Sequence, residues 1–344
     1  MSRNRFVRWP LALATLLSLT SLAQPALAAT RTISDNQGEK QIPTEAQRLV
    51  VFNPTILDTL DALGVPVAAV PKVETALPEF LKKYKTSSAL NAGSMFEPDF
   101  EALSQYQPDL IIAGGRTTNA GTELAKLAPT LNFDRDDRHF PDSLRQQTLK
   151  LGEVFGKSEQ AKALVAKFDA KLSSMKPKVE KAGTAVVVMV TGGKMSAFGP
   201  GTRMGFVYDA LGFKPALTPE QFAAAGGGAR KPGEGGKRPP EGQKPDGQKG
   251  PQAGSAKFQH GKGLSAELLH KANPDWIFVI DRDAAIGRAD AQPAAKVLDN
   301  ALVNQTSAAK NKHIVYLNSA ELYVAGGITT FLHALDDVDQ ALTR

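Results

Sequence analysis

Hydrophobic and polar positions follow two patterns along this chain. Short runs of consecutive apolar residues, such as 49–52 and 110–113, predict buried parallel strands. Between such runs, apolar residues recur every three or four positions, as from Ile56 to Leu63, and predict amphipathic helices. Asn53 and Pro54 suit the start of that first helix, because Asn caps helices and Pro fits the first turn. Alternating strands and helices predict parallel sheets covered by helices on both faces.

The remaining elements follow the same two patterns. The polar segment 29–48 predicts a hairpin or arm ahead of the first sheet. Further buried strands are predicted at residues 65–70, 185–190, 276–280 and 313–317, and further helices at residues 100–106 and 331–342.

One helical pattern is much longer than the others. Apolar residues recur at helical spacing from Ser158 to Lys176, and Pro177 is expected to bend or end the helix. At about 1.5 Å per residue the pattern extends for about 28 Å, which suits a link between two lobes, although an ordinary peripheral helix has the same pattern. We assign residues 158–182 to a linking helix between an N-terminal lobe, 29–157, and a C-terminal lobe, 183–344.

Two stretches of the chain repeat one another in residue type and spacing. They are Glu101, Pro108, Asp109 and Arg116 and, at the same intervals, Glu267, Pro274, Asp275 and Arg282. Each stretch predicts a helix, a turn, a buried strand and then an arginine, so the two lobes are expected to be built alike. Ligands of open α/β sheets bind beyond the carboxyl ends of the strands, where both arginines lie. The repeat therefore predicts one cleft with an arginine from each lobe, suited to an anionic ligand.

Residues 1–28 have the pattern of a cleavable secretory signal. Arg3, Arg5 and Arg8 precede an apolar run, and Ala26-Leu27-Ala28 gives a small-x-small cleavage site. The apolar run is too short to span a bilayer. The sequence has no cysteine, which excludes disulfides, thiolate metal sites and lipid attachment at a cysteine. We therefore expect an exported protein without a lipid anchor, in the periplasm of a double-membraned, Gram-negative bacterium.

The charge distribution argues against a nucleic-acid partner. The formal net charge is +6 at pH 7, and loss of the three arginines of the signal lowers it to +3. The basic residues are scattered and form no aromatic-basic patch.

Residues 226–251 differ from the rest of the chain. They contain nine glycines and five prolines and no aliphatic side chain beyond Ala229, so this segment is expected to be a disordered insertion in the C-terminal lobe. Six basic and three acidic residues within it leave two interpretations open, a mobile basic flap near the cleft or a tolerated insertion.

Five motifs occur in one order along the chain. They are Ala197-Phe198-Gly199-Pro200-Gly201-Thr202-Arg203, Asp209-Ala210-Leu211-Gly212, His260-Gly261-Lys262-Gly263-Leu264-Ser265, Ile277-Phe278-Val279-Ile280-Asp281-Arg282 and Glu321-Leu322-Tyr323-Val324-Ala325-Gly326-Gly327. Together, behind a signal peptide, they resemble the periplasmic binding proteins for ferric catecholate siderophores, of the enterobactin and petrobactin type, that serve ABC importers. The resemblance covers the mature chain except the 226–251 insertion. It implies two Rossmann-like α/β lobes joined by a long helix, the helical-backbone or class III architecture, with a shallow cleft between the lobes.

The resemblance also implies roles for individual residues. In the family three arginines neutralise the ferric catecholate, and the matching positions here are Arg116, Arg203 and Arg282. Arginine stays charged and offers a fork of donors to paired oxygens, while a ferric tris-catecholate carries about three excess negative charges. Some members also bind iron through a histidine and a tyrosine, which correspond to His260 and Tyr323. These two side chains would complete the iron shell that a bis-catecholate leaves open.

Glu101 and Glu267 occupy equivalent positions in the two repeats. In related proteins one glutamate on each lobe docks onto arginines of the permease, and such symmetry suits a permease made of two like subunits. Ordinary carboxylates on a helix surface would give the same pattern. The sequence therefore predicts a monomeric binding protein, not an enzyme, that captures a ferric siderophore without a permanent cofactor and delivers it to an inner-membrane ABC permease dimer.

Other functions are compatible with parts of the pattern. A haem, corrinoid or hydroxamate-siderophore binder belongs to the same class, but a neutral hydroxamate complex does not call for three arginines. An exported siderophore-modifying enzyme would need a nucleophile or metal motif of a kind that the sequence lacks. A direct metal-ion receptor would need converging histidines and carboxylates. The one acidic cluster, Asp134, Asp136 and Asp137, alternates with Arg135 and Arg138 and predicts a solvated loop.

Overall fold

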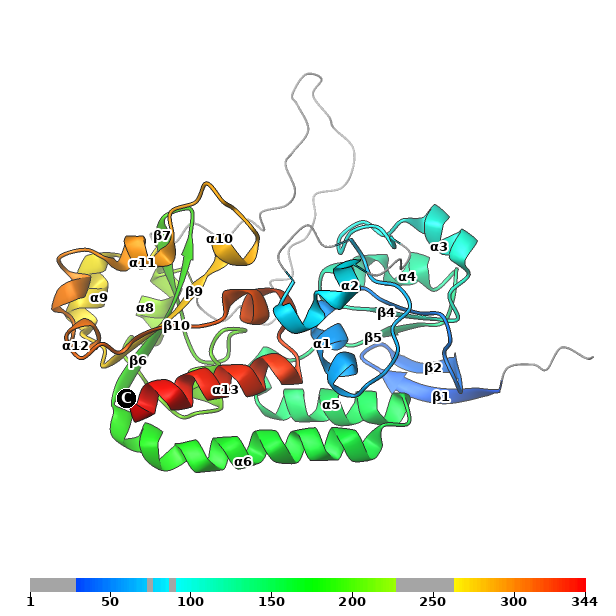
Figure 1. Cartoon of the computed structure of the whole chain (residues 1–344), viewed down its shortest axis with the longest axis horizontal. Helices are drawn as coiled ribbons and strands as arrows, with labels where there is room; N and C mark the ends of the chain where they lie inside the picture. Colours follow the sequence, from blue (N-terminus) through cyan, green and yellow to red (C-terminus); the bar gives the residue numbers. More distant parts are fainter. Residues whose placement is uncertain (1–28, 73–76, 87–90, 227–262) are drawn as a thin grey trace, which may run out of the picture.

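The structure is a computed structural model that describes residues 29–72, 77–86, 91–226 and 263–344. The predicted signal, His260 and all of the predicted insertion except Gly226 lie outside these residues. Two α/β lobes lie side by side along one long helix (Figure 1). Each lobe encloses an apolar core of its own, so the predicted two-lobe architecture is confirmed.

The N-terminal lobe begins with an antiparallel hairpin and continues as a small parallel sheet. The hairpin pairs β1 (Thr30–Asp35) with β2 (Gly38–Pro43), and the sheet has the order β3 (Leu49–Val51), β4 (Leu110–Ala113), β5 (Thr130–Asn132). Its helices are α1 (Pro54–Ala62), α2 (Lys83–Thr86), α3 (Phe100–Tyr106), α4 (Gly121–Leu124) and α5 (Asp142–Val154), with 3-10 turns η1 (Glu79–Leu81), η2 (Gly115–Ala120) and η3 (Asp137–His139).

Two local expectations for this lobe had different outcomes. The start of α1 follows the sequence, since the Asn53 side chain accepts the Thr55 N–H and proline occupies the first turn. The strand predicted at residues 65–70 is wrong, because this segment makes only single bridges, Val50 to Ala69 and Val70 to Asn91. Pro66 and Pro71 have no N–H to donate, which prevents a continuous ladder there.

The C-terminal lobe contains a larger mixed sheet. Its order is β10 (Ile314–Tyr316), β9 (Trp276–Asp281), β6 (Thr184–Thr191), β7 (Lys194–Phe198), with β8 (Lys214–Pro215) also beside β6. Only the β6–β7 pair is antiparallel among the described strands of this sheet. The surrounding elements are α7 (Phe206–Asp209), α8 (Pro219–Ala224), α9 (Ala266–Ala272), α10 (Arg282–Ala285), α11 (Ala294–Leu298), η4 (Val303–Gln305), α12 (Ser307–Lys310), η5 (Glu321–Ala325) and α13 (Ile328–Thr343).

The linking helix α6 spans Ser158–Ala182, the range expected from the sequence. It continues through Pro177 instead of ending there. Buried Met175 and Val179 anchor the turns on either side of the proline, and the proline itself lies on the exposed face of the helix. No helix among the described residues, α6 included, has the length and apolar character to cross a bilayer.

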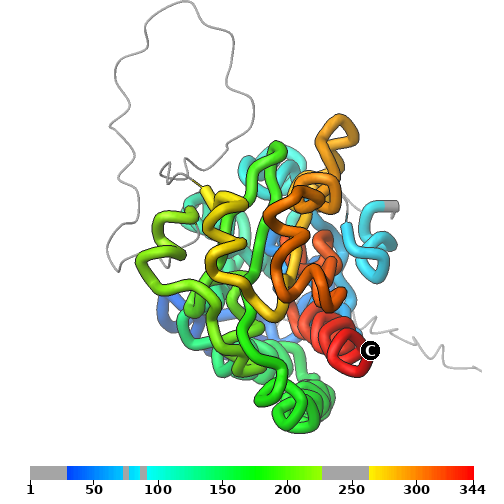
Figure 2. The backbone as a smooth tube through the Cα atoms, turned by 90° about the vertical axis from the view of Figure 1, so that its left-hand side faces the viewer, coloured from blue at the N-terminus to red at the C-terminus, as the bar shows by residue number. Residues whose placement is uncertain are grey.

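The final helix α13 lies beside α6 along the underside of the molecule (Figures 1 and 2). Lys171 and Lys178 of α6 pair with Asp336 and Asp339 of α13. The same helix also packs against α1 of the N-terminal lobe. Helix α13 therefore contacts elements of both lobes.

The repeated motif has one structural role in both lobes. Helices α3 and α9 end in left-handed residues, Gln107 and Asn273, and a Pro-Asp pair follows each. The Asp109 carboxylate accepts the backbone N–H groups of residues 47 and 48 before β3, and the Asp275 carboxylate accepts the N–H of Thr184 at the start of β6. Each aspartate thus fixes the neighbouring strand at the amino end of its sheet.

A buried aspartate joins the lobes. Asp58 of α1 is fully buried, and its carboxylate accepts the N–H groups of Gly327, Thr329 and Thr330 and the Thr330 hydroxyl. Burial raises the pKa of Asp58, and these hydrogen bonds oppose that shift. The carboxylate caps the N-terminus of α13 from the opposite lobe. Such a fixed connection favours a small closure over a wide hinge motion.

Candidate ligand-binding site

The three arginines singled out in the sequence lie where chain segments leave the two sheets. Arg116 is in η2, directly after β4, and Arg282 is the first residue of α10, directly after β9. Arg203 lies in the loop between β7 and α7. Arg116 and Arg282 therefore emerge at the carboxyl ends of parallel strands, the edge at which α/β sheets bind ligands, whereas Arg203 follows β7, which runs antiparallel to β6.

These arginines converge on one aromatic ring. The guanidinium carbons of Arg116, Arg203 and Arg282 lie 5.8, 5.9 and 5.2 Å from the centre of the Tyr323 ring. Nε of Arg282 donates to the Tyr323 hydroxyl at 2.6 Å, and Nη2 of Arg203 donates to the Tyr323 carbonyl at 2.8 Å. The structure thus brings together four of the predicted site residues, while their roles toward a ligand stay predictions.

Tyr323 occupies a short segment between the lobes, residues 321–327, which we call the interlobe segment. Its first five residues form the single π-helical turn η5, a geometry often found at functional sites. Tyr323 packs against the apolar cores of both lobes. The Thr55 hydroxyl of the N-terminal lobe donates to the Ala325 carbonyl at 2.6 Å. Both lobes therefore hold the interlobe segment and set the position of the ring.

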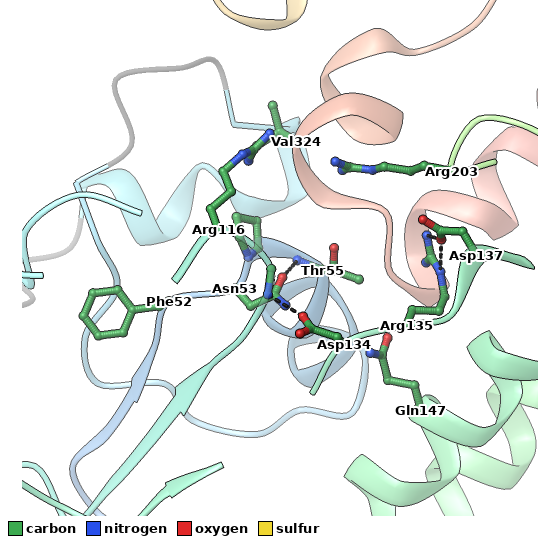
Figure 3. Close-up of a pocket in the computed structure, with 12 residues that line it drawn as sticks. Phe52, Asn53, Thr55, Arg116, Asp134, Arg135, Asp137, Gln147, Arg203 and Val324 are labelled. Atoms are coloured by element: carbon green, nitrogen blue, oxygen red, sulfur yellow. Dashed lines mark hydrogen bonds and ion pairs between the residues drawn. The ribbon is translucent and has the colours of Figure 1, made fainter. Parts of the chain in front are cut away.

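A polar cavity of about 510 Å³ lies beside this segment. Arg116 and Arg203 extend toward one another across it from opposite lobes (Figure 3). The other lining residues are Phe52, Asn53, Pro54, Thr55, Gly115, Asp134, Arg135, Asp137, Gln147 and Val324. A cavity with guanidinium groups that face one another from opposite lobes suits a negatively charged ligand.

The pKa of Arg203 reflects its burial and the positive charges of the neighbouring arginines. Burial lowers the pKa of Arg203 to about 10, and the nearby positive charges of Arg116 and Arg135 act in the same direction. The guanidinium is still protonated at neutral pH. An anion bound among these arginines would offset the cost of burying the Arg203 charge and would reduce the repulsion between the guanidinium groups. The site therefore favours a negatively charged ligand.

The position of Arg116 follows from its local sequence. Gly114 and Gly115 both have positive φ values and turn the chain away from β4. The Gly115 N–H donates to the Asp134 carboxylate, and the Thr117 hydroxyl donates to the Met95 carbonyl at 3.0 Å. These contacts anchor the turn on both sides of Arg116, so that its side chain extends from a fixed backbone.

The prediction of a solvated loop at residues 134–138 is wrong for Arg135, whose side chain is buried. Its side chain is only 7% exposed and pairs with Asp137 at 2.9 Å. It also donates to the Gly326 carbonyl at 2.5 Å and lies over the rings of Phe140 and Phe331. The two rings that cover Arg135 come from α13 and from a position five residues further along the chain. The alternating charges of the loop therefore could not indicate that Arg135 is buried. Arg135 is the third arginine that lines the cavity, with Arg116 and Arg203.

The remaining predicted site residues lie elsewhere or are not described. Glu101 and Glu267 are exposed in the first turns of α3 and α9, which lie at opposite outer ends of the molecule (Figure 1). Hydrogen bonds at the start of α9 lower the pKa of Glu267. His260 lies outside the described residues. Within the described ranges, no group of three or more histidine or acidic side chains is arranged to hold a metal ion.

Comparison with known proteins identifies the family of the chain. A family model described as periplasmic binding protein matches residues 49–232. The chain belongs to the periplasmic binding protein family. It is 33% identical to the petrobactin-binding protein YclQ of Bacillus subtilis, over 85% of this chain and 81% of YclQ. It is 32% identical to the ferric-anguibactin-binding protein FatB of Vibrio anguillarum, over 89% of this chain and 85% of FatB.

Solved structures show the same relationship. The crystal structure of YclQ aligns with a TM-score of 0.75 at 30% identity, covering 92% of this chain and 99% of YclQ. The catecholate-siderophore binding protein VctP of Vibrio cholerae aligns with a TM-score of 0.72 at 29% identity, covering 91% of this chain and all of VctP. The predicted resemblance to siderophore-binding proteins and the class III fold are confirmed, and the family consists of substrate-binding proteins.

Proposed function

We propose that this periplasmic binding protein captures a ferric catecholate-type siderophore in the cleft between its lobes and delivers it to an ABC importer. One observation carries the proposal: guanidinium groups from both lobes lie within 6 Å of a single tyrosine ring. Arginines held in this way can neutralise an iron chelate and donate to its paired oxygens without losing their own charge. The names of the relatives, which bind petrobactin and ferric anguibactin, support the same ligand class.

The charges around the cleft favour a bis-catecholate or mixed catecholate. Four arginines and two aspartates, Asp134 and Asp137, surround the cavity and the Tyr323 ring, which leaves a formal surplus of two positive charges. A ferric tris-catecholate carries about three negative charges, and a bis-catecholate carries about one before further donors bind. A complex with two catecholates and one more anionic donor matches the surplus best.

Tyr323 can supply a donor to such a complex. Its hydroxyl lies 2.6 Å from Nε of Arg282, so the positive charge of Arg282 would stabilise a phenolate bound to iron. We propose that Tyr323, with His260 as its partner, supplies the iron donors that a bis-catecholate leaves open. Oxygen donors and imidazole both suit iron.

Delivery requires contact with a membrane permease. We propose that Glu101 and Glu267 dock onto a permease dimer, one from each lobe, because both are exposed and open equivalent helices at opposite ends of the molecule. The protein would act as a monomer. We further propose export through the signal at residues 1–28 into the periplasm, without a lipid anchor, since the sequence has no cysteine. A periplasmic form beginning at Ala29 is the expected product.

The decisive experiment is a fluorescence-quench titration of the protein from Ala29 to Arg344. Ferric bis-catecholate, ferric tris-catecholate and a ferric hydroxamate are compared at one ionic strength. We expect tight binding of the catecholates and weak binding of the neutral hydroxamate. Equal affinity for the hydroxamate would contradict the charge argument.

A charge-matched control separates the cleft from overall charge. Replacing Arg116, Arg203 or Arg282 by Gln is expected to weaken catecholate binding by about 2–5 kcal/mol per site, in the range measured for charge-paired hydrogen bonds at interfaces. The matched control is Arg48→Gln, which removes the same charge from an exposed position before β3, at the amino end of the sheet. It should leave binding unchanged.

A further inference from the structure

The rim of the cleft carries an exposed aromatic side chain. Phe96 is 57% exposed, the highest value among the large hydrophobic side chains that the structure describes as exposed. Its ring centre lies 5.8 Å from the guanidinium carbon of Arg116. Single exposed hydrophobic residues are common on protein surfaces, so exposure alone has no meaning. The position of this one beside a cleft arginine is what makes it informative.

The backbone holds Phe96 in a tight turn. Gly93 and Pro98 form a bridge, the Ser94 N–H donates to the Glu97 carbonyl at 2.9 Å, and the Ser94 hydroxyl accepts the N–H groups of Phe96 and Glu97. Gly93 has a φ of +94°, and a Cβ there would meet the backbone N of residue 99 at 2.3 Å, so the turn requires glycine. The ring is therefore presented to solvent by an ordered loop.

The turn is also fastened to the segment that carries Arg116. The Thr117 hydroxyl donates to the Met95 carbonyl, and the Met95 sulfur lies 3.7 Å from Nη1 of Arg116. The guanidinium of Arg116 is 5.8 Å from the Phe96 ring and 5.8 Å from the Tyr323 ring. One cation thus lies near two aromatic rings, of which Tyr323 packs against the cores of both lobes and Phe96 is exposed.

We propose that Phe96 contacts the bound ligand directly and stacks on one of its aromatic rings. This inference rests on the proposed function. A catecholate whose oxygens accept hydrogen bonds from Arg116 places its ring within a few ångströms of that guanidinium, and the Phe96 ring centre lies 5.8 Å from the same group. Ring-to-ring contact then covers an apolar surface that water covers in the free protein. Phe96 selects aromatic chelates over non-aromatic chelates of similar charge.

The test compares variants of the whole mature protein with two ligands, ferric bis-catecholate and ferric citrate. Phe96→Ala and Phe96→Leu should each raise the Kd for the bis-catecholate about three- to tenfold, while Phe96→Tyr should stay within about twofold of wild type. The Kd for ferric citrate should not change in any variant. The matched control is Phe100→Ala, which removes another exposed ring, 40% exposed, from nearby α3. It should leave both values unchanged.

Three outcomes would overturn the inference. One is an unchanged Kd for the bis-catecholate in Phe96→Ala, and another is a rescue by Leu, which would show that apolar cover without a ring suffices. The third is an equal loss for both ligands, which would mean that Phe96 only positions Arg116. Failure of the wild-type protein to bind any catecholate would instead contradict the proposed function itself, so the two failures are distinguishable. Thermal unfolding of each variant verifies that the loop mutation leaves the fold intact.

Discussion

Replacing Arg203 by lysine should make ligand binding depend on pH. Burial, together with the charges of Arg116 and Arg135, lowers the pKa of Arg203 to about 10. A lysine has an ordinary pKa of about 10.4, well below that of arginine, and the same surroundings would lower it further. Wild-type Arg203 stays charged across the neutral and mildly alkaline range. The substituted lysine of the free variant would lose its proton at a lower pH than the arginine does.

The sign and size of the effect follow from linkage. The anionic ligand binds the protonated lysine better, so binding above the free-protein pKa must take up one proton. The affinity of Arg203→Lys should therefore be independent of pH where the lysine is protonated, and fall by up to about tenfold for each pH unit above its lowered pKa. A constant loss relative to wild type is also expected, because lysine cannot replace the forked donor.

The assay is a set of quench titrations with ferric bis-catecholate at pH values from about 6.5 to about 9.5. Because the chelate itself changes with pH, every Kd is divided by that of Arg203→Gln, which has no charge to lose at this position. The ratio removes the behaviour of the ligand. A ratio that stays constant over this range would refute the reasoning, since it would mean that burial and neighbouring cations do not act on a charge at position 203.

Three further predictions test other parts of the structure. Asp58→Ala should lower the free energy of unfolding by about 3–5 kcal/mol in urea denaturation, because it leaves buried N–H groups of α13 without an acceptor; a loss below about 1 kcal/mol would contradict the interlobe role. Tyr323→Phe should alter the visible charge-transfer band of the bis-catecholate complex, and an unchanged spectrum would remove the phenol from the iron shell. Replacing Glu101 and Glu267 together by alanine should leave ligand Kd unchanged and reduce siderophore uptake by cells. Undiminished uptake would argue against docking.

Much of the fold was predictable because local rules and burial agree along the chain. The strand at residues 110–113 and the helix at residues 100–106 occur where the apolar pattern predicted them, and α6 contains the whole pattern from Ser158 to Lys176 and extends beyond it. The exceptions have physical causes. Prolines interrupt the segment at residues 65–70, and Pro177 is tolerated inside α6 because buried residues hold the helix on both sides of it.

The site was predictable only in part. The internal repeat identified Arg116 and Arg282, since a repeated unit places equivalent side chains at equivalent edges of two sheets. Arg135 was missed, because its burial depends on Phe331 of α13, which lies far away in the sequence. Phe96 was missed as well, since nothing in a lone phenylalanine distinguishes an exposed ring from a core residue.

The sequence by itself determined the residue types that can neutralise an anionic ligand, the main strands and helices, and the repeat of one helix–strand–arginine unit in the two halves. These properties depend on neighbours along the chain and on spacing. Only the tertiary structure decided that three arginines from distant segments surround one ring, that Asp58 caps a helix of the other lobe, and that Arg135 is buried. Such contacts arise when two lobes close on a shared segment, and no local pattern specifies which side chains then meet.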